Sequence, residues 1–263
     1  MKEIQALLLA AGPGTRLHPL TVDWPKCLMP IKDRPLLEYW LCMLFSNDIN
    51  QVFVNIHHHR KTVESFLARE QFESWVSGVH EPQLLGTAGT LRKNADYLRD
   101  RTVLLAHADN WCQCNFSHFL EFHCVHRPVG TVMTMMTFRT ISPEMCGIVE
   151  LDEKGIVQGF HEKVENPPGN LANGAVYLLE PEIIDWIAKQ KSATDFSTDV
   201  LPRFLGRIAT WENTKIHRDI GTRQSLMSAQ KDPQSELCWP ETDNWLSLFQ
   251  DNPIHNHLIT EAI

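Results

Sequence analysis

Leu7-Leu8-Leu9-Ala10-Ala11-Gly12-Pro13-Gly14-Thr15-Arg16-Leu17 is an apolar run that leads into a glycine-rich segment, and Pro25-Lys26 follows it after a short gap. The leucines predict a buried strand, and the glycines predict a loop directly after it. Because Gly12 and Gly14 have no Cβ, the backbone there can turn sharply and present N–H groups to an anion, while Arg16 and Lys26 supply positive charge. The pattern fits a phosphate-binding loop, and it also fits an ordinary strand-to-helix turn.

Composition and charge narrow the class of protein. With 263 residues, 43% of them hydrophobic, the chain can bury the core of one large domain, with or without an appendage. A formal charge of −8 argues against a general nucleic-acid binder, which needs a positive field to displace counterions. The first strand leaves no room for the basic start of a signal peptide, and no apolar run is long enough to span a membrane. We therefore expect a cytoplasmic protein.

The seven cysteines form no C-x-x-C pair, which predicts reduced thiols in a cytosolic protein. Cys112-Gln113-Cys114 and His57-His58-His59 are the stretches that suggest a metal. Zinc sites usually show paired ligands at regular spacing, and neither stretch has them. We expect no zinc at either place.

Strand and helix patterns alternate along the chain. A proline followed by helically spaced apolar residues predicts a helix over 34–44, the β-branched run 51–56 predicts a strand, and 62–72 predicts the next helix. The continuous apolar run 102–106 is typical of a strand covered on both faces, and 147–157 predicts a hairpin. The sequence therefore predicts an α/β fold with a Rossmann-like, mixed, mainly parallel sheet flanked by helices.

Charged residues follow several of these elements: the loop with Arg16 and Lys26, then Asp109, Glu162-Lys163 and Asp219. Loops at the carboxyl ends of strands in such a sheet converge on one crevice, where the two aspartates could share Mg²⁺ and the cations could bind phosphates. This set suits metal-assisted phosphate chemistry, because phosphoryl and nucleotidyl transfer both depend on positioning and charge neutralisation. Taken singly, each aspartate equally fits a helix cap, and the cations fit solvated surface charges.

A set of motifs occurring in order from residue 4 to about residue 228 resembles the sugar-1-phosphate nucleotidylyltransferases. They are Ala11-Gly12-Pro13-Gly14-Thr15-Arg16-Leu17, Pro25-Lys26, Leu85-Gly86-Thr87-Ala88-Gly89, Asp109-Asn110, Glu162-Lys163, Asn173-Gly174 and Asp219-Ile220-Gly221-Thr222. The closest resemblance is to mannose-1-phosphate and D-glycero-D-manno-heptose-1-phosphate guanylyltransferases, through Asp195-Phe196-Ser197 and Asp199-Val200-Leu201-Pro202. The chain departs from the pattern at Ala108, where the family often has glycine, and at Val164, where it usually has proline.

The resemblance implies the nucleotide-diphospho-sugar transferase type of fold, with a catalytic domain over residues 1–231. Its nucleotide half would cover about 1–130, its sugar-binding half about 131–231, and 232–263 would be a C-terminal appendage. The implied reaction transfers a nucleoside monophosphate from an NTP to a sugar 1-phosphate and releases pyrophosphate. The implied cofactor is Mg²⁺, held by Asp109 and Asp219.

The resemblance also implies a role for each site residue. Arg16, Lys26, Asp109 and Lys163 are the expected catalytic residues: Arg16 binds the departing phosphates, Lys26 the α-phosphate and Lys163 the sugar phosphate. The expected sugar-phosphate site consists of Gly147, Glu162, Lys163 and Asn173. The expected nucleotide site consists of Leu9, Ala11, Gly12, Gly14, Thr15, Arg16, Glu81, Gly86, Ala88 and Gly89.

Glu81 indicates which base is bound. Thymidylyl- and uridylyltransferases of the family tend to carry glutamine there, an amide that both donates and accepts hydrogen bonds. A carboxylate only accepts, which suits the adjacent donors of guanine and is poor against uracil or thymine. GTP is therefore the expected NTP.

Alternatives remain. One is a uridylyl-, thymidylyl- or cytidylyltransferase acting on another phosphorylated substrate, and another is a nucleotide-sugar-sensing module without catalysis. Intact Lys26, Asp109 and Asp219 argue against the sensor, and Leu17 argues against a dinucleotide-binding oxidoreductase because a third glycine is absent. Self-association is left open.

Overall fold

The computed structural model describes residues 3–235, 237–239 and 241–259, and it divides the chain into two compact units. Unit 1 comprises Met1–Leu7, Leu85–Ala106 and Cys114–Lys215, and unit 2 comprises Leu8–Leu84, His107–Gln113 and Ile216–Ile263. The units are thus interleaved along the sequence, because the chain passes back to unit 2 for the short segment His107–Gln113 and again after Lys215.

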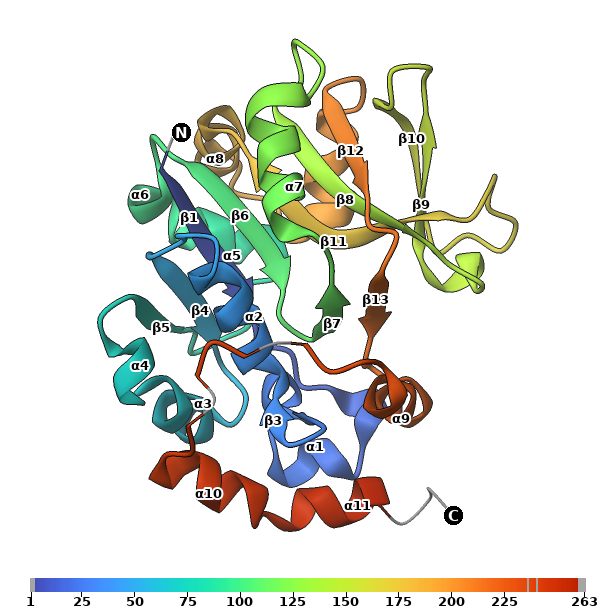
Figure 1. Ribbon diagram of the computed structural model, residues 1–263. Helices are drawn as coiled ribbons and strands as arrows, with labels where there is room; N and C mark the ends of the chain where they lie inside the picture. The colour runs from blue at the N-terminus through green and yellow to red at the C-terminus, as the bar shows by residue number, and fades with distance from the viewer. Residues whose placement is uncertain (1–2, 236, 240, 260–263) are drawn as a thin grey trace. The chain divides into compact units, whose positions relative to one another are not determined.

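Unit 1 is built around antiparallel strands that meet at the long strand β11. β11 (Leu171–Leu179) pairs with β6, β8 and β9, and β9 in turn forms the predicted hairpin with β10. β12 runs parallel to β8, so the sheet is mixed (Figure 1). The strands of this unit are β6 (Thr102–His107), β8 (Met133–Arg139), β9 (Gly147–Leu151), β10 (Val157–Glu162) and β12 (Ile208–Glu212), together with Ile4–Leu7 of β1 (Ile4–Leu9).

The helices of unit 1 connect these strands. They are α5 (Thr87–Lys93), α6 (Ala95–Leu98), α7 (Phe116–Glu121), η3 (Phe122–His126), η4 (Pro143–Met145), α8 (Pro181–Lys189), η5 (Phe196–Val200) and η6 (Leu201–Arg203). α8 packs against β11 and also against α5 and α6, which gives the sheet an apolar cover. Ile183, Ile184 and Ile187 are the buried side of α8, at the three- and four-residue spacing of an amphipathic helix.

Unit 2 contains the loop after β1 and the first crossover helix. β4 (Val52–Ile56) and β5 (Val76–His80) are parallel, and α3 (Arg60–Leu67) and α4 (Glu70–Glu73) pack on β5 (Figure 1). The remaining elements are η1 (Thr15–Leu17), α1 (Leu20–Asp23), η2 (Lys26–Leu28), β2 (Pro30–Ile31), β3 (Arg34–Pro35), α2 (Leu36–Phe45), β7 (Asn110–Gln113), β13 (Ile216–Asp219), α9 (Arg223–Lys231), α10 (Asn244–Gln250), η7 (Pro253–His255) and α11 (Asn256–Ile259).

The predicted α/β architecture is confirmed: a mixed sheet flanked by helices. The strands predicted at 51–56 and 102–106 form where expected, since each is a β-branched or apolar run that becomes buried. The hairpin predicted over 147–157 forms from β9 and β10, and its second strand continues to Glu162. The helix predicted over 62–72 is interrupted, because α3 ends at Leu67 and α4 begins only at Glu70. In the described ranges, no helix combines the length and the apolar character needed to cross a membrane.

The C-terminal segment from Asp232 packs on α2, α3 and α4 within unit 2. Trp239 lies against Phe45, Phe72 and Trp75, with ring centroids 5.2 to 6.2 Å apart. Trp239 therefore anchors this segment by aromatic packing.

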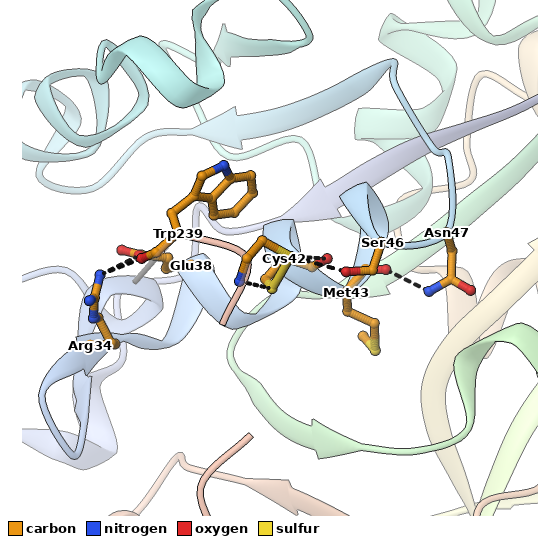
Figure 2. The surroundings of a disulfide bond; sticks show 8 residues. Arg34, Glu38, Cys42, Met43, Ser46, Asn47 and Trp239 are labelled. Carbon is orange, nitrogen blue, oxygen red and sulfur yellow. Dashed lines mark hydrogen bonds and ion pairs between the residues drawn. A yellow bond between two sulfur atoms is a disulfide. The ribbon is translucent and has the colours of Figure 1, made fainter. Parts of the chain in front are cut away.

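A disulfide joins Cys42 of α2 to Cys238, as Figure 2 shows. The expectation that all the cysteines are reduced was therefore wrong for this pair. Sequence spacing could not reveal the pair because 196 residues separate the two positions. Beside it, the Trp239 carbonyl accepts a hydrogen bond from the buried guanidinium of Arg34 at 3.2 Å (Figure 2).

A second anchor is the buried cation Arg69, which connects α2 to the C-terminal segment. Its guanidinium donates to Glu38 at 2.6 Å and to Asp243, the N-cap of α10, also at 2.6 Å. The same guanidinium lies 5.2 to 5.4 Å from the ring centroids of Phe66, Phe72 and Trp245. Because a buried charge is costly unless it is paired, these partners account for burial of the cation.

Candidate active site

The glycine loop turns tightly over Lys26. Gly14 has φ of +63°, a conformation that residues with a Cβ rarely adopt, and a Cβ there would lie 2.9 Å from Thr21 Cγ2 and 3.1 Å from Lys26 Cβ. The Thr21 hydroxyl donates to the Gly14 carbonyl at 2.8 Å and so holds the turn. Glycine is therefore required at this position both for backbone conformation and for close packing.

Lys26 is the central cation of the site. Its ammonium donates to Asp109 Oδ2 at 2.7 Å and to Asp219 Oδ1 at 2.9 Å, and its side chain is only 7% exposed. Burial disfavours the charged form, but the carboxylates of Asp109 and Asp219 outweigh burial, so the pKa of Lys26 is raised. The interpretation of Lys26 as a solvated surface charge is therefore wrong.

Arg16 extends the same cluster toward solvent. Its Nη2 donates to Asp219 Oδ2 at 3.1 Å, while the side chain stays 60% exposed. Burial of Asp219 opposes its ionisation, but Lys26 and Arg16 outweigh burial and lower the pKa of the carboxyl group. Arg16 is thus held near Lys26 but remains accessible to an anion.

A two-stranded antiparallel ribbon brings the aspartates together. β7 pairs with β13, and the register places Asp219 opposite Asn110, the neighbour of Asp109. Neither aspartate caps a helix: α7 is capped by Asn115, and α9 is capped by Thr222. The helix-cap interpretation of Asp109 and Asp219 is therefore wrong.

The residues of the predicted nucleotide site in unit 2 differ in their solvent exposure and in their position relative to the Lys26 cluster. Leu9 and Ala11 are buried at the end of β1, and Gly12 and Thr15 are exposed. Glu81 follows β5 and is only 1% exposed, with Oε1 at 3.5 Å from the Asn55 amide nitrogen. It therefore lies against the strand ends and not in the Lys26 cluster.

Gly86, Ala88 and Gly89 lie in unit 1, where they have a clear packing role. Gly86 has φ of +76°, and a Cβ there would collide with the Thr194 carbonyl oxygen. The same carbonyl accepts the Ala88 and Gly89 amides at 2.9 and 3.4 Å. The loop geometry at the start of α5 is accounted for by this contact, and nucleotide binding by these three residues stays a prediction.

The predicted sugar-phosphate residues also lie in unit 1, around the β9–β10 hairpin. Gly147 pairs with Glu162 in the strand register, and a Cβ on Gly147 would lie 2.7 Å from the Glu162 carboxylate. Lys163 Nζ is 3.2 Å from Glu162 Oε1, and its side chain is 63% exposed. Asn173 donates to the Tyr177 hydroxyl at 2.6 Å. Gly147, Glu162 and Lys163 are thus neighbours, and their binding of a sugar phosphate stays a prediction.

The sequence interpretation missed Asn55, which binds the start of the glycine loop. Its Oδ1 accepts the amide N–H groups of Ala10 at 2.6 Å and Ala11 at 3.2 Å. The sequence did contain a sign of this role, because an asparagine stands inside the apolar strand run 52–56. Asparagine is unfavourable in a buried strand unless its side-chain amide forms hydrogen bonds.

The donor set at Lys26 fits a magnesium ion. Asp109 and Asp219 converge on one ammonium group, and Mg²⁺ takes one or two protein carboxylates plus substrate phosphates and water. Among the residues that the structure describes, no cluster of three or more His, Cys, Asp or Glu side chains could hold a metal.

Comparison with known proteins identifies several relatives. The chain is 30% identical over 230 residues to the mannose-1-phosphate guanylyltransferase catalytic subunit beta of Drosophila melanogaster, covering 85% of this chain and 61% of that protein. It is 30% identical over 219 residues to the UTP–glucose-1-phosphate uridylyltransferase of Synechocystis, covering 77% and 55%. The chain thus spans about 60% of the length of the curated relatives it matches.

A solved structure and a family model complete the comparison. A Bacillus anthracis crystal structure, provisionally described as a glucose-1-phosphate thymidylyltransferase, matches with a TM-score of 0.81 and 20% identity, covering 93% of this chain and 99% of that one. At that identity the likeness shows the fold alone. The model of the family described as nucleotidyl transferase matches residues 5–236, which contain the glycine loop and all four charged residues of the Lys26 cluster. The chain therefore belongs to the nucleotidyl transferase family.

Proposed function

We propose that this protein transfers a nucleoside monophosphate from an NTP, preferably GTP, to a sugar 1-phosphate, giving a nucleotide sugar and pyrophosphate. The observation that carries the proposal is the buried Lys26 ammonium, bonded to both Asp109 and Asp219 beside a glycine loop. A charge so placed is preorganised to stabilise negative charge that accumulates at phosphorus. A purely structural ion pair would not need an adjacent loop able to hold an anion.

In the proposed reaction, an oxygen of the sugar phosphate forms a bond to the α-phosphorus while the bond from that phosphorus to the bridging oxygen of the β-phosphate breaks. Lys26 contacts the α-phosphate, and the exposed Arg16 binds the pyrophosphate that leaves. A phosphate dianion is already a nucleophile, so no side chain has to remove a proton. In-line displacement of this kind relies on positioning and charge neutralisation.

Asp109 and Asp219 are the residues that would hold Mg²⁺. When bound, Mg²⁺ would neutralise charge on the phosphate oxygens. In the free chain, Lys26 satisfies one oxygen of each carboxylate and Arg16 satisfies the second oxygen of Asp219. The two cations and the two carboxylates therefore balance one another, and Mg²⁺ bound to the carboxylates would give the cluster a net positive charge.

The sugar 1-phosphate is assigned to the residues of the β9–β10 hairpin. Lys163 is exposed and able to contact a phosphate, and Glu162 and Asn173 offer groups for sugar hydroxyls. Gly147 keeps the hairpin surface free of a side chain next to Glu162. A reaction that consumes NTPs fits the predicted cytoplasmic location.

Guanine is the proposed base because Glu81 can only accept hydrogen bonds when ionised. Its carboxylate is 1% exposed, so contact with a base requires the side chain to be uncovered when the nucleotide binds. The 30% identity to a Synechocystis uridylyltransferase favours UTP as the second candidate.

A screen for pyrophosphate release, with GTP, UTP, dTTP, CTP and ATP each combined with a series of sugar 1-phosphates, tests the proposal directly. We expect the greatest turnover with GTP and a hexose or heptose 1-phosphate. Equal or greater turnover with UTP or dTTP would overturn the guanine assignment. Nucleotide binding without pyrophosphate release in any combination would instead support the sensing module.

A further inference from the structure

Asn55 lies at the end of β4, with only 4% of its surface exposed, and it binds the first residues of the phosphate loop. Its side chain receives the amide N–H of Ala10 at 2.6 Å and that of Ala11 at 3.2 Å. Because both backbone partners are donors, the atom that faces them must be the amide oxygen. Without that acceptor, two largely buried N–H groups at the start of the loop would lose a partner.

The other end of the same amide points toward the residue proposed to read the base. Asn55 Nδ2 lies 3.5 Å from Glu81 Oε1. The backbone keeps the two residues side by side, since β4 and β5 are parallel neighbours and the Glu81 N–H donates to the Ile56 carbonyl at 2.8 Å. One short, rigid side chain thus spans from the loop amides to the Glu81 carboxylate.

We propose that Asn55 is a positioning residue that couples base recognition at Glu81 to the geometry of the phosphate loop. This inference rests on the proposed function, because it takes Glu81 as the base contact. Asn55 acts through its neighbours: its oxygen fixes the loop amides, and its nitrogen holds the carboxylate where donors of a base edge would bind.

The two roles use different atoms, so substitutions can separate them. Asn55→Asp keeps an oxygen acceptor for the Ala10 and Ala11 amides, but it has no donor for Glu81 and adds a like charge beside it. Asn55→Leu has a similar volume and removes both functions. Asn213→Leu is the matched control, since Asn213 is 3% exposed and its oxygen also accepts a backbone N–H, from Lys215 at 3.0 Å.

Inorganic tripolyphosphate is the probe for the loop, because it offers phosphates without a base. We expect Asn55→Leu to weaken its binding, measured by calorimetry on the full chain, about tenfold, the effect of leaving buried donors unpaired. Asn55→Asp and Asn213→Leu should bind it within about twofold of the wild-type chain, a difference too small for a lost hydrogen bond. Base recognition at Glu81 is measured by the ratio of kcat/KM for GTP to kcat/KM for UTP. This ratio should fall in both Asn55 variants but not in the control.

The outcomes separate this inference from the proposed function. Unchanged tripolyphosphate binding by Asn55→Leu, or a loss in Asn55→Asp as large as that in Asn55→Leu, would overturn the role of the oxygen. An unchanged GTP-to-UTP ratio in both variants would overturn the coupling. If Asn55→Leu does not fold, Asn55→Asp alone decides the result. A wild-type chain that binds tripolyphosphate but does not prefer GTP would defeat the guanine assignment while leaving the loop role intact.

Discussion

Lys26 and Asp109 form a largely buried ion pair whose Nζ–Oδ2 distance is 2.7 Å. We expect Lys26→Met, which keeps the length of the side chain, to lower the rate of pyrophosphate release by about 100-fold or more, as loss of a preorganised charge does elsewhere. Asp109→Asn should have an effect of similar size. Far-UV circular dichroism should show the fold intact in both variants. Turnover at the wild-type rate in either one would refute the site assignment.

Asp219 predicts a stability difference that depends on pH. Its pKa is lowered in the folded chain from the ordinary value of 3.8, so the ionised carboxylate stabilises the fold at neutral pH. That contribution is present above 3.8 and is lost as pH falls through the lower pKa of the folded state. We expect Asp219→Asn to lower the unfolding midpoint in urea at pH 7 and to have a smaller effect at pH 3, which lies below the ordinary value of 3.8. Equal destabilisation at both pH values would contradict the linkage.

The raised pKa of Lys26 predicts the opposite pH dependence, a loss of stability at high pH. An ammonium whose folded pKa lies above the ordinary 10.5 contributes stability that is complete below 10.5 and is lost as pH rises through the raised value. Lys26 should therefore stay charged throughout the neutral range, and kcat between pH 7 and 9 should show no decline caused by its deprotonation. The prediction would be contradicted if kcat of the wild-type chain declined between pH 7 and 9 while the residual kcat of Lys26→Arg did not. The decline would then be due to deprotonation of Lys26.

Gly86 and Gly155 are two glycines with positive φ that differ in the space around them. Both have φ near +75°, but a Cβ on Gly86 would collide with the Thr194 carbonyl, whereas a Cβ on Gly155 would have its nearest neighbour, Thr210 Oγ1, at 3.7 Å. Gly155→Ala should cost only backbone strain, about 1 to 2 kcal/mol. Gly86→Ala should cost that and about 1 to 3 kcal/mol more for overpacking. Thermal unfolding of both variants checks the order, and equal midpoints would contradict it.

The Cys42–Cys238 disulfide should stabilise unit 2. A bond that closes a loop of 196 residues restricts the unfolded chain, and such a bond typically contributes about 2 to 4 kcal/mol. We expect the reductant dithiothreitol to lower the unfolding midpoint of the wild-type chain and to leave that of Cys42→Ser unchanged. A reductant effect of equal size in both would show that the stabilisation lies elsewhere.

Much of the fold could be predicted from the sequence because its strands are apolar runs and its loops carry glycine at positions that need it. The Lys26 cluster could be identified from motifs as a set of residues. Its geometry could not, because the pairing of β7 with β13 joins segments about a hundred residues apart, and neither short strand has a periodic pattern of its own. Asn55 was missed for a related reason: its partners at Ala10 and Ala11 are contacts between distant segments.

Arg69 has a consequence for where this protein can be shortened. The family match ends at residue 236, yet Asp243 and Trp245, which pair with the guanidinium and cover it, lie beyond that point. A chain truncated at the family boundary would leave Glu38 as the carboxylate partner of Arg69 and would strip an aromatic face from the buried cation. The packed unit 2 therefore extends beyond the piece that sequence similarity delimits.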